Sequence, residues 1–211
     1  MERQRKVSMK KISLFLLTTI FVASCSGNHD YSPKPRGFSR IVFPKKEYQF
    51  YQGNCPFTFI YPKYAVIDTD KTSIKGKGKG GKELENMKAL LNMQFPQFNG
   101  TLHLSYESIT SKKIFNELIE DAYSFAYKHT VKSSGIDQGT ISYPDRKVYG
   151  IYYTIDGNAA SSVQFYLTDS TKNYLRGSLY FNTEPRLDSI QPVLTFVKKD
   201  VDLMIKSLKW R

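Results

Sequence analysis

The clearest chemical signal in the chain is a cysteine at the end of an apolar leader. Val22, Ala23 and Ser24 precede Cys25, so one aliphatic and two small residues stand directly before a thiol. A secretory signal needs a charged start, a short apolar core and a small-residue cleavage site. A cysteine directly after such a site can take a diacylglycerol. We therefore predict that residues 1–24 are a lipoprotein signal peptide and that Cys25 is lipidated.

The leader has the composition that this prediction requires. Its apolar run, Ile12 to Val22, is shorter than the about 20 residues that a membrane-spanning helix needs. Five basic residues precede the run: Arg3, Arg5, Lys6, Lys10 and Lys11. Met9 is a second natural start. The alternative is an ordinary secretory signal followed by a chance cysteine.

Export and lipidation limit the possible ligands. We expect a cell-envelope lipoprotein, held by two or more acyl chains because one gives only marginal attachment. The sequence favours the periplasmic side and does not choose between inner and outer membrane. Nucleotides, nucleic acid and cofactors are not expected as ligands there. The net charge of +12 falls to +8 without the leader, which holds five basic residues and one Glu. This charge fits lipid headgroups, lipopolysaccharide, an acidic partner, or an ordinary solvated surface.

A glycine-lysine segment imitates a phosphate-binding loop. Gly76, Gly81 and Lys82 satisfy G-x-x-x-x-G-K, but Glu83 follows where Mg²⁺ coordination needs Ser or Thr. No buried strand precedes the segment. We therefore interpret residues 71–82 as a mobile basic insert, with transient contact to anionic headgroups as its functional alternative.

Metal and hydrolase chemistry have weaker support. The three histidines, His29, His103 and His129, are far apart, and no metal-ligand spacing occurs. The acids Glu117, Glu120 and Asp121 lie on the polar side of a predicted helix. They leave open a hydrolase that acts on envelope glycans, because only their separation in space decides this. Cys55 is expected to be buried, since it opens an apolar strand.

Periodicity predicts an α+β fold in which helices cover an antiparallel sheet. Strands are expected at 57–61, 92–95 and 101–106, and a short helix at 83–91. A helix capped by Ser111 should end at 133–135. A second helix, from Ile190 to Leu208 with Ser189 as its cap, should lie on the sheet through Val193, Val197, Val201, Met204 and Leu208. The order of elements resembles the PsbP/Mog1 type of sandwich.

Between the two helices we predict a three-stranded meander. A three-residue loop at 156–158 would pair Ile151 with Val163 and Tyr149 with Phe165, which places all apolar residues on one face. Asn158 would then adopt the left-handed conformation.

The meander also contains the densest set of polar residues. Tyr166 should face Arg176, as a cation–π pair, and Gln164 should face Ser178. The candidate interaction surface is Asn158, Ser161 and Ser162 at one end, Asp169 and Ser170 at the other, and Gln164, Tyr166 and Arg176 between them. The alternative is a hydrogen-bonded sheet surface packed under a helix.

Several segments together resemble the gliding motility lipoprotein GldD family of the Bacteroidetes. They are residues 31–37, 61–65, 128–132, 149–153, 157–165, 167–171, 175–182 and 207–210, and the most specific lie within 128–182. The resemblance implies an envelope lipoprotein needed for gliding and for the linked type IX secretion machinery, without catalytic residues. Family members often have a second cysteine upstream of the segment that matches 92–106. Met87–Leu91 contains none here, which leaves Cys55 unpaired.

The sequence therefore predicts a signal peptide at 1–24, a flexible tether at 25–45 and one globular α+β domain at 46–211. Its expected role is that of a non-enzymatic accessory that binds protein partners and is attached to the membrane through acyl chains. A glycan-acting hydrolase would show a deep pocket with two converging carboxylates. A lipid- or headgroup-binding module would show an apolar cavity between sheet and helix.

Overall fold

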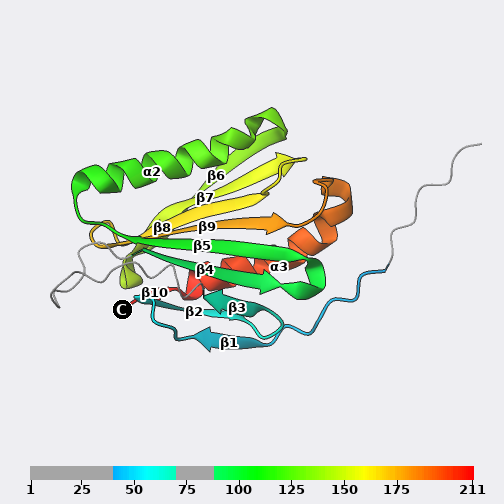
Figure 1. The fold of residues 1–211 in the computed structure, drawn as a ribbon, viewed down its shortest axis with the longest axis horizontal. Coiled ribbons are helices and arrows are strands. Elements are labelled where there is room, and N and C mark those ends of the chain that lie inside the picture. The colour runs from blue at the N-terminus through cyan, green and yellow to red at the C-terminus, as the bar shows by residue number, and fades with distance from the viewer. Residues whose placement is uncertain (1–39, 70–87) are drawn as a thin grey trace, which may run out of the picture. The chain divides into compact units, whose positions relative to one another are not determined.

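The largest element of the fold is a seven-stranded antiparallel sheet (Figure 1). The computed structural model describes residues 40–69 and 88–211, and Ile41–Arg211 forms one compact unit. Across the sheet the strands are β3 (Val66–Thr69), β4 (Lys88–Phe95), β5 (Gly100–Ser108), β9 (Asn173–Phe181), β8 (Val163–Thr168), β7 (Val148–Gly157) and β6 (Ser133–Tyr143). Short 3-10 turns, η1 (Pro96–Phe98) and η3 (Pro144–Arg146), connect β4 to β5 and β6 to β7. The predicted α+β class with an antiparallel sheet is confirmed, and the PsbP/Mog1 likeness stays a prediction.

One face of this sheet packs on helix α3 (Leu187–Ser207) and holds the larger of two apolar clusters. The predicted stripe on α3 is confirmed. Val197, Val201 and Met204 are inaccessible to solvent, and Val193 is half-buried. Burying each large apolar side chain contributes about 1.5–3 kcal/mol. The sheet contributes Leu91, Leu102, Leu104, Phe165, Leu175 and Leu179 to the same cluster.

Helix α3 begins three residues before the position that we predicted. Its N-cap is Arg186, and the predicted cap Ser189 lies inside the first turn. The side chain of Asn158 accepts a hydrogen bond from the Leu187 N–H at 3.0 Å. The first turn is therefore satisfied by a residue from a distant loop, which local sequence does not reveal. Pro192 lies beyond the first turn, inside the helix.

A second, three-stranded sheet closes the other side of this core. It consists of β1 (Tyr48–Tyr51), β2 (Phe57–Pro62) and β10 (Lys209–Trp210), with β2 in the middle and against α3. The ring of Tyr51 stacks on Phe59 at 4.8 Å, and its hydroxyl donates to the Cys55 sulfur at 3.5 Å. Cys55 is 1% exposed and free, so its predicted burial is confirmed.

The opposite face of the large sheet is covered by α2 (Lys112–Tyr127). Ser111 caps this helix as predicted, because its Oγ accepts from the Ile114 N–H at 3.2 Å. The predicted end of the helix is wrong. It stops at Tyr127, a 3-10 turn η2 (Lys128–Val131) follows, and residues 133–135 begin β6. Only Ile141 of β6 is buried, so this strand carries no apolar alternation that would have predicted it.

The predicted register of the meander is also wrong, and the meander has four strands. Tyr149 pairs with Thr168, and Ile151 pairs with Tyr166. The left-handed residue of the loop is Gly157, at φ 88°, and not Asn158. The predicted register assumes that all apolar residues of the meander lie on one face, but helices cover both faces of the sheet. Apolar residues therefore occupy both sides of β7, and the argument from a single apolar face does not apply.

Other predictions fall partly or wholly outside the described residues. Residues 88–91 of the predicted short helix belong to β4, so that prediction is wrong there. The signal peptide, Cys25 and the basic insert 71–82 lie outside the described ranges. The compact unit begins at Ile41, before the predicted boundary at 46. The ring of Phe43 stacks on Phe196 at 4.5 Å, which packs the end of the predicted tether onto α3.

Candidate functional site

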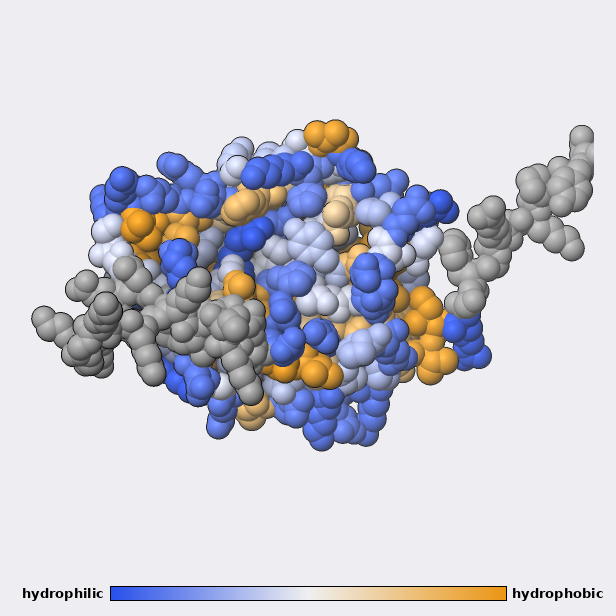
Figure 2. Space-filling view, in the orientation of Figure 1, coloured by the Kyte–Doolittle hydropathy of each residue, from blue (hydrophilic) through white to orange (hydrophobic). Residues whose placement is uncertain are grey.

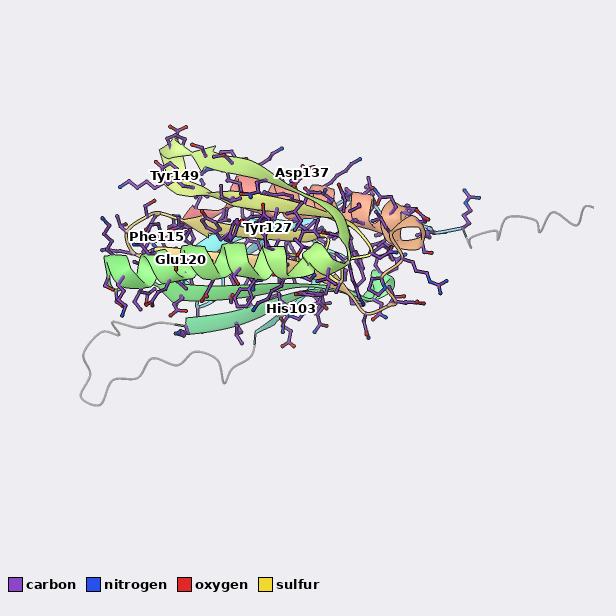
Figure 3. The ribbon with its side chains drawn as sticks, turned by 90° about the horizontal axis from the view of Figure 1, so that it is seen from above. His103, Phe115, Glu120, Tyr127, Asp137 and Tyr149 are labelled. Carbon is purple, nitrogen blue, oxygen red and sulfur yellow. The ribbon has the colours of Figure 1, made fainter. Side chains whose placement is uncertain are left out.

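Helix α2 covers only part of its face of the sheet. In Figure 3 it crosses the sheet with Asp137 of β6 on one side and His103 of β5 on the other. The Tyr174 hydroxyl donates to the Leu118 carbonyl at 3.0 Å, and the Gln138 side-chain amide donates to the Tyr127 hydroxyl at 2.7 Å. The helix therefore fastens to β9 and β6, while His103 on β5 stays exposed.

Arg176 is the central charged residue beneath α2. Its Nη2 donates to the Gln164 Oε1 at 2.7 Å, and its guanidinium carbon lies 4.5 Å from the centre of the Phe125 ring. The predicted backbone pairing of Tyr166 with Arg176 is confirmed. The cation–π partner is Phe125 of the helix, however, and Tyr166 stacks on Tyr174 instead. Burial lowers the pKa of Arg176, but a guanidinium remains charged at neutral pH.

A row of polar side chains crosses the sheet beside Arg176. Gln164 pairs with Ser178 as predicted, Ser178 pairs with His103, and His103 pairs with Asn92. The His103 Nδ1 lies 2.7 Å from the Asn92 Oδ1. Burial lowers the pKa of His103, so its ring is neutral at pH 7. The Gln164 Nε2 and the Ser178 Oγ are buried without a hydrogen-bond partner.

A groove of about 240 Å³ lies between α2 and strands β4, β5 and β9. Its lining includes Lys88, Glu107, Leu118, Asp121, Phe125 and Arg176. Lys88 and Glu107 form an ion pair at 2.6 Å. The groove is smaller than the about 300–1,000 Å³ of small-molecule sites, and Glu117 and Glu120 are exposed and outside its lining.

The Asp169 side chain stabilises the loop between β8 and β9 through hydrogen bonds. The Asp169 Oδ1 accepts from the backbone N–H groups of Thr171, Lys172 and Asn173 at 2.7–2.9 Å. Burial acts to raise the pKa of Asp169, but these bonds outweigh it and hold that pKa below its usual value. Ser170 takes the left-handed conformation at φ 65°. The carboxylate is therefore occupied by its own loop.

The predicted interaction residues do not form one continuous surface. Four of them, Ser161, Ser162, Gln164 and Tyr166, are buried. The other four reach the surface at three separate places: Asn158 near the start of α3, Asp169 and Ser170 in the β8–β9 loop, and Arg176 at the groove.

His129 follows α2 in η2, close to Arg176. Burial and the nearby Arg176 charge lower the pKa of His129. Both effects disfavour the charged form of the ring at this end of α2.

A buried acid on α3 was missed by sequence reasoning. The Asp200 carboxylate is inaccessible to solvent and lies 2.7 Å from the Lys46 Nζ. The Tyr48 hydroxyl donates to it at 3.0 Å, and the Tyr64 hydroxyl donates to its other oxygen. The available sequence signal was the position of Asp200, an acid that directly precedes the buried Val201 on the predicted helix. These contacts fasten Lys46, Tyr48 and Tyr64 to α3.

The surface is mostly hydrophilic on the side drawn in Figure 2, where hydrophobic residues form separate small patches. Within residues 40–69 and 88–211, no helix is long and apolar enough to span a membrane. The same residues contain no group of three His, Cys, Asp or Glu arranged to hold a metal ion.

Residues 28–210 match the family model described as "Gliding motility lipoprotein GldD". The chain belongs to this family. The resemblance stated from sequence segments is thereby confirmed, and the GldD family links the chain to gliding motility and to the envelope lipoproteins. No curated protein matches the chain. The GldD match begins after Cys25, so lipidation of that residue stays a prediction.

Proposed function

We propose that this chain is a non-enzymatic accessory of gliding motility and of the linked type IX secretion machinery. It is anchored in the envelope by lipid on Cys25, faces the periplasm and acts through contacts with other proteins. The GldD family match over residues 28–210 carries this proposal.

The chemistry of the described residues supports a binding role over catalysis. The groove under α2 is small, and Glu107 inside it is paired with Lys88. Asp169 is occupied by its loop, and Asp200 by Lys46 and two tyrosines. Acid–base catalysis needs a carboxyl group free to exchange a proton with a substrate. The carboxylates of Glu107, Asp169 and Asp200 are all held by protein groups, which leaves Asp121 as a single acid of the groove lining outside the ion pairs of the described residues.

The attachment of the first residues supports anchoring close to a membrane. Lys46 is bound to Asp200, and 15 residues separate Cys25 from Ile41. The 16 residue steps from Cys25 to Ile41 span at most about 58 Å when fully extended. A lipid on Cys25 would therefore hold the folded unit within that distance of the bilayer.

Deleting the gene and restoring it on a plasmid tests the proposal. The deletion strain is expected to lose both spreading on agar and secretion of a type IX cargo protein, and the plasmid is expected to restore both. A deletion strain that glides and secretes normally would contradict the proposal. Intact-mass spectrometry of the purified protein should show an acylated Cys25 as the first residue.

A variant of the groove separates binding from catalysis. Glu107→Gln together with Asp121→Asn removes two carboxylates from the groove under α2. A non-enzymatic accessory should support normal gliding with these changes, at a normal protein level. Loss of gliding by a folded, abundant variant would favour the glycan-acting hydrolase.

A basic cleft favours headgroup binding as a second candidate function. It measures about 480 Å³ and is lined by Lys147, Lys172, Lys209, Arg211 and Trp210, together with Arg146, Asn173, Asp145 and Asp169. The cations outnumber the acids, and an indole suits a membrane interface. Co-sedimentation with vesicles tests it. Binding to vesicles with anionic lipid, lost on Lys172→Glu with Lys209→Glu, would support this second function.

A further inference from the structure

Strand β6 is a long edge strand whose outer side is open. It stands last in the order of the large sheet and pairs with β7 along Ser133–Tyr143. The opposite edge, β3, has only four residues. Seven of the 11 residues of β6 are exposed, and in Figure 3 its residue Asp137 lies beyond α2. Edge strands of this length offer unpaired backbone groups to another chain.

The register shows which backbone groups of β6 point outward. The Ile155 N–H donates to the carbonyl of Ser162, the residue just before β8, at 3.0 Å. Because backbone groups alternate in direction along a strand, those of the preceding residue, Thr154, point to β6. Thr154 pairs with Asp137, and the register then continues without a break to Tyr143. Residues 137, 139 and 141 therefore bond to β7. The N–H and C=O groups of residues 136, 138, 140 and 142 point away from β7, to the side where no strand of the described residues pairs with β6.

The edge has little protection against an added strand. Natural edges are guarded by lysine, proline or charges that point inward. Between Gly135 and Tyr143 the strand has one charged residue, Asp137, and no proline or lysine. Its irregularity lies at the beginning, between Ser133 and Gly135. From Gly135 to Tyr143 the strand pairs with β7 in a regular register, so its outer edge is straight enough to accept another strand.

Both ends of β6 are basic. Lys128 and Lys132 precede the strand, and Arg146 and Lys147 follow it together with one acid, Asp145. Within the described residues none of these four cations has an ion-pair partner: the Lys128 ammonium lies over Phe125, and the Arg146 guanidinium over Tyr143. A second copy of the chain added antiparallel would bring Lys132 beside Arg146 and Lys147 of the other copy. Like charges therefore oppose self-pairing.

Two tyrosines of α2, the exposed Tyr123 and the half-buried Tyr127, flank the edge. Tyr123 and Tyr127 stack at 4.2 Å, and Gln138 of β6 donates to the Tyr127 hydroxyl. Tyr123 is 50% exposed. In strand addition, main-chain hydrogen bonds give affinity, and contacts with alternate side chains give specificity. The tyrosine pair offers an apolar contact beside Gln138 to a side chain on the α2 side of an added strand.

We propose that β6 accepts an extended segment of a partner protein as an eighth strand, and that acidic residues flank this segment at both ends. The proposal rests on the proposed function, because it names the surface and the kind of partner through which the accessory acts. It also accounts for an edge that is open in the middle and basic at its ends.

Amide hydrogen exchange on the full lipidated chain in nanodiscs tests the geometry. The probe is a synthetic peptide of alternating threonine and valine with two glutamates at each end. At about ten times its dissociation constant, exchange at residues 136, 138, 140 and 142 should slow about tenfold. Residues 137, 139 and 141 already bond to β7 and should change little. Protection of another element, or none at all, would overturn the proposal.

Matched variants separate backbone pairing from charge. Thr140→Pro removes an outward N–H and should lower peptide affinity about tenfold, while Thr140→Ala keeps that N–H and should bind normally. Lys132→Glu with Lys147→Glu should weaken binding, and Lys199→Glu on α3 should not. A peptide with lysines in place of the glutamates should bind poorly. Equal binding by Thr140→Pro, or a dimer that this change abolishes, would contradict the proposal.

Gliding of the same variants separates this proposal from the proposed function. Thr140→Pro should stop gliding at a normal protein level and melting temperature, and Thr140→Ala should glide. If Thr140→Pro glides while the deletion strain does not, strand addition is wrong and the accessory role stands. If the deletion strain itself glides, the accessory role is wrong. If Thr140→Pro fails to fold, Lys132→Glu with Lys147→Glu replaces it and is expected to stop gliding.

Discussion

The Lys46 ammonium lies 2.7 Å from the buried Asp200 carboxylate, so the first residues of the folded unit are fastened to its last helix. The same ammonium donates to the Phe196 carbonyl at 2.9 Å and lies 4.0 Å from the centre of the Phe196 ring. Phe43, three residues earlier in the chain, stacks on the same Phe196 ring, so residues 43–46 pack together on α3.

Removing the Asp200 carboxylate should destabilise the fold strongly. Asp200→Ala leaves Lys46 and two tyrosine hydroxyls without their acceptor, which should cost about 3 kcal/mol of unfolding free energy. Urea unfolding measures this. Glu120→Gln, an exposed acid on α2, is the control and should change stability by less than about 0.5 kcal/mol. Equal effects of the two changes would show that Asp200 does not fasten the fold.

Two strand glycines test the register of the meander. A Cβ on Gly150 would lie 1.8 Å from the Tyr166 carbonyl oxygen, whereas one on Gly139 meets only the Tyr152 oxygen at 4.0 Å. Gly150→Ala should therefore destabilise by about 3 kcal/mol or prevent folding, and Gly139→Ala should be nearly neutral. Thermal melting of both variants measures this difference in stability. A stable Gly150→Ala variant would mean that β7 and β8 are paired differently.

Arg176 is expected to brace α2 on the sheet. Arg176→Ala leaves the Gln164 side chain buried without its donor and uncovers Phe125, which should cost about 1–2 kcal/mol. Stability and cellular protein level should fall together. Arg186→Ala, at an exposed position, should change neither. A folded, abundant Arg176→Ala protein that cannot glide would instead make Arg176 a partner contact.

The stability contribution of Asp169 should depend on pH in the acidic range. Its loop bonds hold the folded pKa below the ordinary 3.8, so this contribution is complete above that value and is lost as the pH falls through the folded pKa. Chemical unfolding between pH 7 and pH 2.5 should show the wild type losing its advantage over Asp169→Ala as the pH falls. A constant difference between the two proteins would contradict this assignment.

The parts of the fold that sequence predicted are those with strong local signals. The stripe of Val197, Val201 and Met204 predicted how α3 packs, and the short loop after β8 predicted that Gln164 faces Ser178. The α3 residues lie on one face of a single helix, and Gln164 and Ser178 lie close together in the chain. Local sequence is sufficient to predict both arrangements.

The parts of the fold that the sequence did not predict depend on tertiary contacts. β6 lies at an edge with one buried residue, so it lacks the alternation of a core strand. The side-chain acceptor for the first N–H of α3 comes from Asn158, and the partners of Asp200 are more than 130 residues away. The candidate surface is not continuous because α2 covers its middle. The residue pattern of β8 and β9 does not show on which face of the sheet a helix packs.

Gliding of a strain that carries Cys25→Ala as its only copy tests the central claim most directly. The claim is that a lipid-anchored protein serves motility through contacts near the membrane. Cys25→Ala with a cleavable secretory signal should be exported at a normal level, should fractionate away from membranes and should fail to support gliding or secretion. Normal gliding by this anchor-free protein would contradict the account.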